Sequence, residues 1–107
     1  MASGMIVQSR PNIGYSFEQL AVSNSVQVLT PSLYMPSTTS GGASSAFLTN
    51  DGAAIRYTYE GTTPSATVGH LLSDGGTLIL NGQNQMAQFK CIRESADSEI
   101  SITYERE

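Results

Sequence analysis

Cysteine, lysine and tryptophan are scarce or absent in this chain of 107 residues, which has one cysteine, one lysine and no tryptophan. Cys91 cannot form a disulfide within the chain, and one thiolate alone cannot hold a structural zinc ion. No apolar run approaches the roughly 18 residues of a membrane-spanning helix. The N-terminal apolar patch at 5–7 is too short for a secretory signal. We therefore expect a protein that folds in a reducing cytoplasm without processing.

Charge is scarce as well. Charged residues make up 13% of the chain, against about 25% in an average soluble protein. Five Lys and Arg face nine Asp and Glu, for a net charge of −4, so there is no basic surface for nucleic acid or an anionic membrane. With 39% hydrophobic residues, 15 Ser and 10 Thr, the composition predicts one folded β domain whose uncharged surface suits contact with other proteins.

Alternation of apolar and polar residues, the period of a half-buried strand, dominates the chain. It is clearest at 100–104, where two isoleucines and a tyrosine share one face. A further strand is predicted at 87–91, with Ala87, Phe89 and Cys91 facing inward. The pattern predicts about seven short strands, at 17–22, 26–29, 46–48, 55–60, 77–80, 87–91 and 100–104.

Glycine-centred turn signals separate these segments. Asp51-Gly52 is a strong signal for a tight hairpin, because both central residues of such a turn adopt positive φ. Further turn signals stand at 61–64, 74–76 and 81–82. We predict an all-β fold: a single antiparallel β-sandwich, immunoglobulin-like or jelly-roll-like, with local hairpins in its C-terminal half.

Two segments lack a strand pattern. Residues 1–14 are predicted to form an extended N-terminal arm ahead of a sandwich domain at 15–107, and residues 30–45, rich in Pro, Gly, Ser and Thr, a long loop within that domain. The apolar residues of both segments have no obvious place in the core, so we expect them to contact other protein surfaces. These candidate interface residues are Met5, Ile6, Val7, Ile13, Tyr15, Leu33, Tyr34 and Met35.

Three apolar residues fall on the face of their strands opposite to the expected core. Ile79, Ile92 and Met86 all have this parity. A strand that is apolar on both faces is typical of one covered on its second side. The pattern therefore indicates a covering partner, such as another subunit.

Catalytic chemistry finds little support. His70 is the only histidine, so a Ser-His-acid triad would have to use it. Ser73 and Asp74 follow closely, but no serine has the G-x-S-x-G surroundings of a nucleophile elbow. No spacing marks a carboxylate pair, a metal-binding cluster or a phosphate loop. We therefore predict no enzymatic activity, metal, cofactor or small-molecule substrate, and a buried apolar role for Cys91.

The order of motifs over about 45–106 resembles small structural proteins encoded among the virion genes of tailed bacteriophages. Those chains share I-R-Y, G-x-x-P, G-x-x-L, an apolar hairpin and I-R-E, here at 55–57, 61–64, 69–72, 77–80 and 92–94. The resemblance implies a non-enzymatic capsid decoration (cement) protein on the outer head surface, made in the host cytoplasm. It implies the major capsid protein and further copies of the chain as partners; we expect a trimer first and a dimer second.

A second resemblance leaves an alternative open. The order I-x-Y-T-x-x-G-T-x-P at 55–64 is also similar to immunoglobulin-like accessory modules of chitobiase-type glycosidases, which have Asp where this chain has Glu60. It implies a carbohydrate-binding or adhesion module, of the tail, fibre or glycosidase-accessory type. Tyr57 and Tyr59 share a strand face and would offer a sugar platform, although their alternation with polar neighbours favours a core role.

Overall fold

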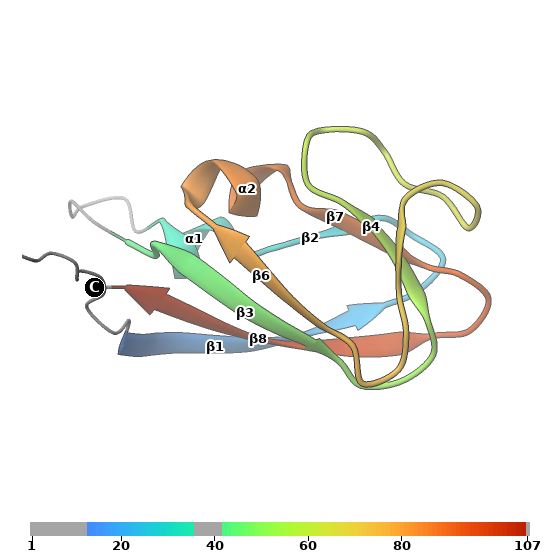
Figure 1. Ribbon diagram of the computed structural model, residues 1–107, viewed down its shortest axis with the longest axis horizontal. Helices are drawn as coiled ribbons and strands as arrows, with labels where there is room; N and C mark the ends of the chain where they lie inside the picture. The colour runs from blue at the N-terminus through green and yellow to red at the C-terminus, as the bar shows by residue number, and fades with distance from the viewer. Residues whose placement is uncertain (1–12, 36–41, 107) are drawn as a thin grey trace, which may run out of the picture.

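The computed structural model describes residues 13–35 and 42–106. Within them the chain forms two four-stranded antiparallel sheets packed face to face (Figure 1), which confirms the predicted all-β sandwich. The first sheet contains, in order, β1 (Ile13–Val22), β8 (Ser98–Arg106), β3 (Ser45–Asn50) and β6 (Thr77–Asn81). The second contains β2 (Gln27–Val28), β7 (Lys90–Arg93), β4 (Ile55–Thr58) and β5 (His70–Leu72). The helices of this part of the chain, α1 (Pro31–Tyr34) and α2 (Gln83–Gln88), are both too short to cross a membrane.

The chain changes sheet after almost every strand. Within the described residues, β4 and β5 are the only consecutive strands that pair with each other, and every other connection crosses between the sheets. The expected hairpin at Asp51-Gly52 is therefore wrong, because β3 and β4 lie in different sheets. The strands on either side of the 74–76 turn, β5 and β6, also lie in different sheets. A turn signal predicts that the chain reverses but not which strand it then pairs with.

One buried side chain joins three of these connections. The Asn50 side chain lies at the end of β3, and its Nδ2 donates to the carbonyl oxygens of Ala53 (3.0 Å), Leu72 (2.9 Å) and Ser73 (3.2 Å). The Ser98 hydroxyl donates to its Oδ1. Asn50 therefore ties the turn after β3 to the end of β5 and to the start of β8.

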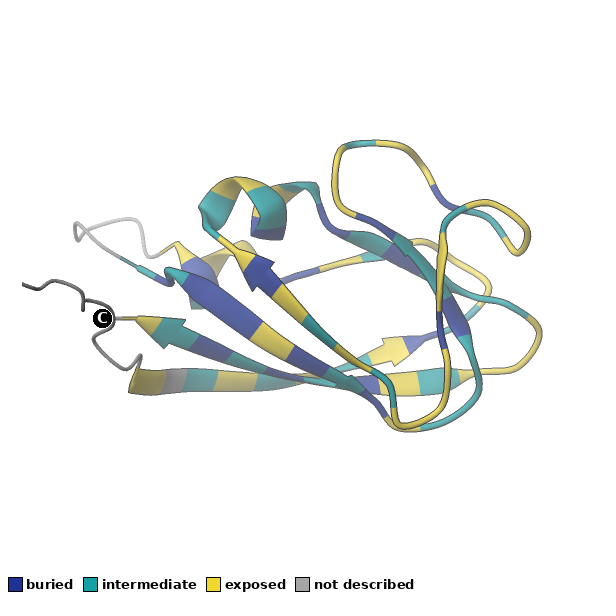
Figure 2. Ribbon diagram, viewed as in Figure 1, coloured by how far each residue is buried: buried dark blue, intermediate teal, exposed yellow. Residues whose placement is uncertain are grey.

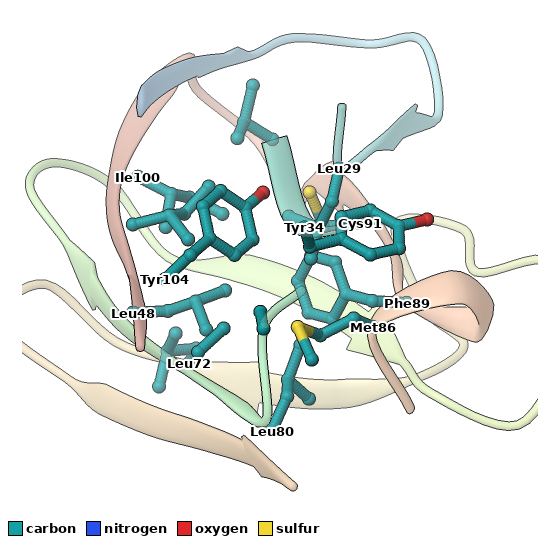
Figure 3. Close-up of a cluster of buried hydrophobic side chains, with 14 of the residues drawn as sticks. Leu29, Tyr34, Leu48, Leu72, Leu80, Met86, Phe89, Cys91, Ile100 and Tyr104 are labelled. Carbon is teal, nitrogen blue, oxygen red and sulfur yellow. The ribbon is translucent and has the colours of Figure 1, made fainter. Parts of the chain in front are cut away.

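The core lies between the sheets and is made by the inward faces of their strands. Exposed and buried residues alternate along β3, β6 and β8 (Figure 2), as the period-two pattern predicts. Ile100, Ile102 and Tyr104 of β8 are all fully buried. Figure 3 shows their neighbours from both sheets and both helices, among them Leu29, Tyr34, Leu48, Leu72, Leu80, Met86, Phe89 and Cys91.

The predicted strand at 87–91 is wrong in its first half. Residues 83–88 form α2 instead, so Ala87 is exposed, while Phe89 and Cys91 are buried as expected. Met86 is also fully buried, facing the core from α2 and not from the outer face of a strand. A six-residue helix is shorter than the 11-residue window in which a 3.6-residue period becomes visible, so the pattern did not reveal it.

The 30–45 segment holds one helical turn and contributes to the core. Pro31 begins α1, at the position where its missing N–H is least costly. Tyr34 is buried, with its ring 5.9 Å from that of Tyr104. The expectation that Tyr34 has no place in the core is therefore wrong. Leu33 packs partly against the core, and Met35 is 49% exposed.

The expected N-terminal arm lies mostly outside the described residues, and with it Met5, Ile6 and Val7. Ile13 and Tyr15 belong to β1, whose register against β8 shifts between Gly14 and Ser16. Residues 13 and 14, which were predicted as part of the arm, therefore lie in a strand of the sandwich.

Candidate functional site

The outer face of the first sheet carries an unusual row of large apolar side chains. Phe17 of β1 lies opposite Thr103 of β8, Thr103 lies opposite Phe47 of β3, and Phe47 lies opposite Ile79 of β6. Phe17 is 57% exposed, Phe47 39% and Ile79 58%. We call Phe17, Phe47 and Ile79 the apolar row. It spans the full width of the sheet, about 14 Å at the usual strand spacing.

The next cross-strand row on this face carries no charge. It consists of Gln19, Ser101, Thr49 and Thr77, which are in register across the same four strands. The Ser101 hydroxyl donates to Asp51 at the sheet's end (3.0 Å) and accepts from the Gln19 amide (3.4 Å). Two adjacent rows of the sheet can therefore be covered by another surface without burying an unpaired charge.

A second surface feature lies on the other sheet, where the long connection between β4 and β5 leaves the sandwich (yellow-green, upper right in Figure 1). Three rings gather there. The Tyr57 ring centroid lies 5.4 Å from that of His70 and 6.4 Å from that of Tyr59, and Tyr59 lies 6.1 Å from His70. Tyr57 also stacks on the buried Phe89 at 5.9 Å. The ring cluster therefore extends from the core to the surface.

Two of these rings, Tyr59 and His70, line an open cleft of about 420 Å³, which we call the aromatic cleft. Its one carboxylate, Glu60, accepts the Thr62 N–H at 3.1 Å. Hydrogen bonds from Thr62, with a smaller contribution from the charge of Lys90, hold the pKa of Glu60 below its usual value. Thr58 Oγ1 donates to the Thr62 carbonyl at 2.5 Å, so the chain turns back sharply at the cleft rim. The lining residues are Thr58, Tyr59, Glu60, Thr62, Val68, Gly69 and His70.

Gly69 sets the position of His70 beside the tyrosines. Its φ is +126°, and a Cβ there would lie 3.0 Å from the Tyr57 carbonyl oxygen and 3.2 Å from the Tyr57 nitrogen. Arg56 Nη1 donates to the Gly69 carbonyl at 3.1 Å, and Nη2 of the same guanidinium pairs with Glu94 at 2.9 Å. The close approach that only glycine allows brings β5 onto β4, with His70 opposite Tyr57.

The predicted interface residues are only partly brought together. Of those that the structure describes, Ile13 is 61% exposed at the start of β1, whereas Tyr34 is buried in the core. Phe17 and Phe47 were missed by the sequence reasoning. Phe47 stands between two inward-facing residues, which is the same parity signal that marks Ile79. That signal, applied along every strand, marks Phe17 and Phe47 as outward-facing but does not show that they share a row with Ile79.

The described residues also bear on metal and thiol chemistry. Within residues 13–35 and 42–106, no three His, Cys, Asp or Glu side chains lie close enough together to hold a metal ion. Burial raises the pKa of the Cys91 thiol to about 12. The thiol is therefore protonated at neutral pH and, being fully buried, acts as an apolar side chain in the core.

Two features of the described residues are therefore candidates for function: the apolar row and the aromatic cleft, on opposite sheets of the sandwich. Searches against protein-family models, curated proteins and solved structures found no match to this chain.

Proposed function

We propose that the chain is a non-enzymatic structural protein of a tailed-phage virion, a capsid decoration protein that binds the outer head surface and stabilises the shell. The observation that carries this proposal is the apolar row. Phe17, Phe47 and Ile79 are exposed in one cross-strand row of the sheet, with Thr103 of β8 between Phe17 and Phe47. Large exposed apolar groups grouped in this way mark a surface that another protein covers.

The sheet makes the apolar row a suitable docking surface for the capsid. The backbone of all four strands is held by ladder hydrogen bonds, so little conformational freedom is lost when a partner covers it. Two phenylalanines supply large aromatic side chains, a residue type that is enriched in the cores of protein interfaces. The uncharged row of Gln19, Ser101, Thr49 and Thr77 keeps the cost of desolvation low on that side of the apolar row.

The proposed partners are the major capsid protein and further copies of the chain, with a trimer favoured over a dimer. The protein would be made in the host cytoplasm and then join the head. Its net charge of −4 and single lysine disfavour a nucleic-acid role. Native mass spectrometry of the purified chain measures the oligomeric state, and quantitative mass spectrometry of virions measures the copy number, which is in the hundreds for a decoration protein.

Attachment to heads tests the role of the apolar row. Heads of the phage that encodes the chain, stripped of this protein, would be incubated with the fluorescently labelled chain, and bound protein separated by sedimentation. We expect the double variant F17S/F47S to bind at least about 10-fold more weakly, since both anchors are lost. The matched control is L71S, which removes an apolar side chain of similar exposure on β5 (48% exposed) and leaves attachment unchanged.

Circular dichroism and thermal unfolding verify that each variant is folded. Equal attachment of the F17S/F47S variant and the unmodified chain would show that the head is bound through another surface.

A further inference from the structure

The aromatic cleft has a built platform of rings. Tyr57 and Phe89 stack at an interplanar angle of 28°, Tyr57 and Tyr59 at 24°, and Tyr59 and His70 at 30°. The array begins at the fully buried Phe89 and ends at Tyr59, which is 38% exposed, and His70. Because the inner rings hold the outer ones in place, the exposed ring faces are preorganised for a ligand.

The rim of the cleft supplies hydrogen-bonding groups next to these ring faces. A carboxylate has about four acceptor positions, and Thr62 uses two of those of Glu60 through its amide and side chain. Glu60 lines the cleft together with Thr58 and Thr62. A ligand seated on the rings can therefore donate hydrogen bonds to Glu60.

The charge of the cleft favours a neutral ligand. Lys90 Nζ donates to the Gly61 carbonyl at 3.3 Å, and its charge acts on the Glu60 carboxylate. A positive charge is thus already supplied, which reduces the attraction for a cationic ligand. A purely apolar ligand would cover Glu60 without offering it a donor, at a cost of desolvation.

We propose that the aromatic cleft binds the pyranose ring of a neutral saccharide, with one C–H face stacked on Tyr59 and hydroxyl groups donating to Glu60. A pyranose combines an apolar face with hydroxyls around its edge, which matches rings bordered by a carboxylate and threonine hydroxyls. The negative face of an aromatic ring attracts weakly positive C–H groups. The volume of about 420 Å³ lies within the usual range for small-molecule sites and holds one or two sugar rings.

NMR titration of the full-length ¹⁵N-labelled chain tests this directly. The probes are the methyl glycosides of glucose, galactose, mannose and N-acetylglucosamine, together with maltose, cellobiose and chitobiose, each to roughly 50 mM, since isolated sugar sites bind in the millimolar range. Tetramethylammonium chloride serves as the cationic probe. We expect saturable shifts of amides at 58–62 and 68–70 with at least one saccharide. Tighter binding of a disaccharide than of its monosaccharide would identify a glycan chain, and equal binding a single sugar residue, as the ligand.

Variants separate stacking from hydrogen bonding. Y59A should weaken binding about 10-fold or more because the exposed ring is lost, whereas Y59F keeps the ring and should stay within about 2-fold. E60Q should weaken it about 5-fold or more, since hydrogen bonds to charged groups are the stronger ones. The control F47S lies on the opposite sheet and should bind sugar like the unmodified chain.

Three results would overturn the proposal: no shift with any saccharide, shifts with tetramethylammonium alone, or unchanged sugar affinity in a folded Y59A variant. Head attachment is measured separately through the apolar row, so failure of one proposal leaves the other intact.

Discussion

Gly69 illustrates how one residue positions the aromatic cleft. Its positive φ and its close approach to the Tyr57 backbone let β5 lie against β4, so that the His70 ring reaches the tyrosines. Gly75 also has positive φ (+80°), but a Cβ there would meet nothing within 4 Å. The two glycines therefore differ in steric contact and share the requirement for an unusual backbone conformation.

We predict that G69A lowers the free energy of unfolding by about 2–4 kcal/mol, since it adds a steric clash to the backbone strain. G75A should cost only about 1–2 kcal/mol, the strain alone. Urea unfolding followed by circular dichroism measures both. Equal costs for the two variants would mean that the contact with Tyr57 is relaxed without penalty.

The buried Cys91 thiol and Tyr104 hydroxyl make the stability of the protein decrease at alkaline pH. Burial raises the pKa of Cys91 to about 12, and burial, followed by the hydrogen bond to Glu18, also raises the pKa of Tyr104 above its usual value. Above pH 9 the unfolded chain loses the Cys91 proton while the folded chain keeps it. The contribution of this thiol to stability is therefore fully present below pH 9 and is lost as the pH rises toward 12.

We expect the Cys91 thiol to account for about 2 kcal/mol of lost stability between pH 8 and pH 10.5, on the order of 1.4 kcal/mol per pH unit above its unfolded pKa. Urea unfolding at both pH values measures this loss. C91A should show a smaller pH dependence than the unmodified chain. An identical dependence in both proteins would assign the whole effect to the tyrosines.

Among the strands and helices, β8 was predictable from the sequence pattern and α2 was not. From Glu99 to Glu105, buried and non-buried positions of β8 alternate strictly, and such a pattern has one interpretation. The six residues of α2 offer less than two helical turns, and the run from Ala87 to Cys91 imitates a strand. Short apolar runs are ambiguous because burial on one side is all that they encode.

The exposure of Ala87 provides a test of α2. We predict that A87E changes the free energy of unfolding by less than about 0.5 kcal/mol, because position 87 faces solvent on the helix. M86A should cost about 2–5 kcal/mol, since Met86 is fully buried in the core. Thermal or urea unfolding measures both changes. Strong destabilisation by A87E would mean that residue 87 faces the core, as in the predicted strand, and not solvent.

At the scale of the whole molecule, the sandwich depends on connections that cross between its sheets. Asn50 is the polar group on which several of them converge. We predict that N50A lowers the free energy of unfolding by about 2–4 kcal/mol, since the Leu72 carbonyl and its neighbours lose a buried donor. Urea unfolding measures this, with the exposed N24A as control; a loss below about 1 kcal/mol would mean that water replaces the amide.

Removal of residues 1–12 separates folding from attachment. Described residues from Ile13 onward form both four-stranded sheets and the core cluster between them, so the truncated chain should unfold at the same urea concentration as the full chain. Because the removed residues include the apolar Met5, Ile6 and Val7, we predict markedly weaker binding to phage heads in the sedimentation assay. Undiminished binding would exclude these residues from the interface.

By itself the sequence determined the all-β class, the clearly alternating strands such as β8, and the low charge of the chain. Alternation, turn residues and composition are local properties of the chain. Only the tertiary structure decided that Asp51-Gly52 leads to the other sheet, that Tyr34 fills the core, and that Phe17, Phe47 and Ile79 stand in one row. The aromatic cleft likewise needs β5 to pair with β4. Each of these depends on which strands become neighbours, and that choice is made by packing between residues far apart in the chain, where no local pattern records it.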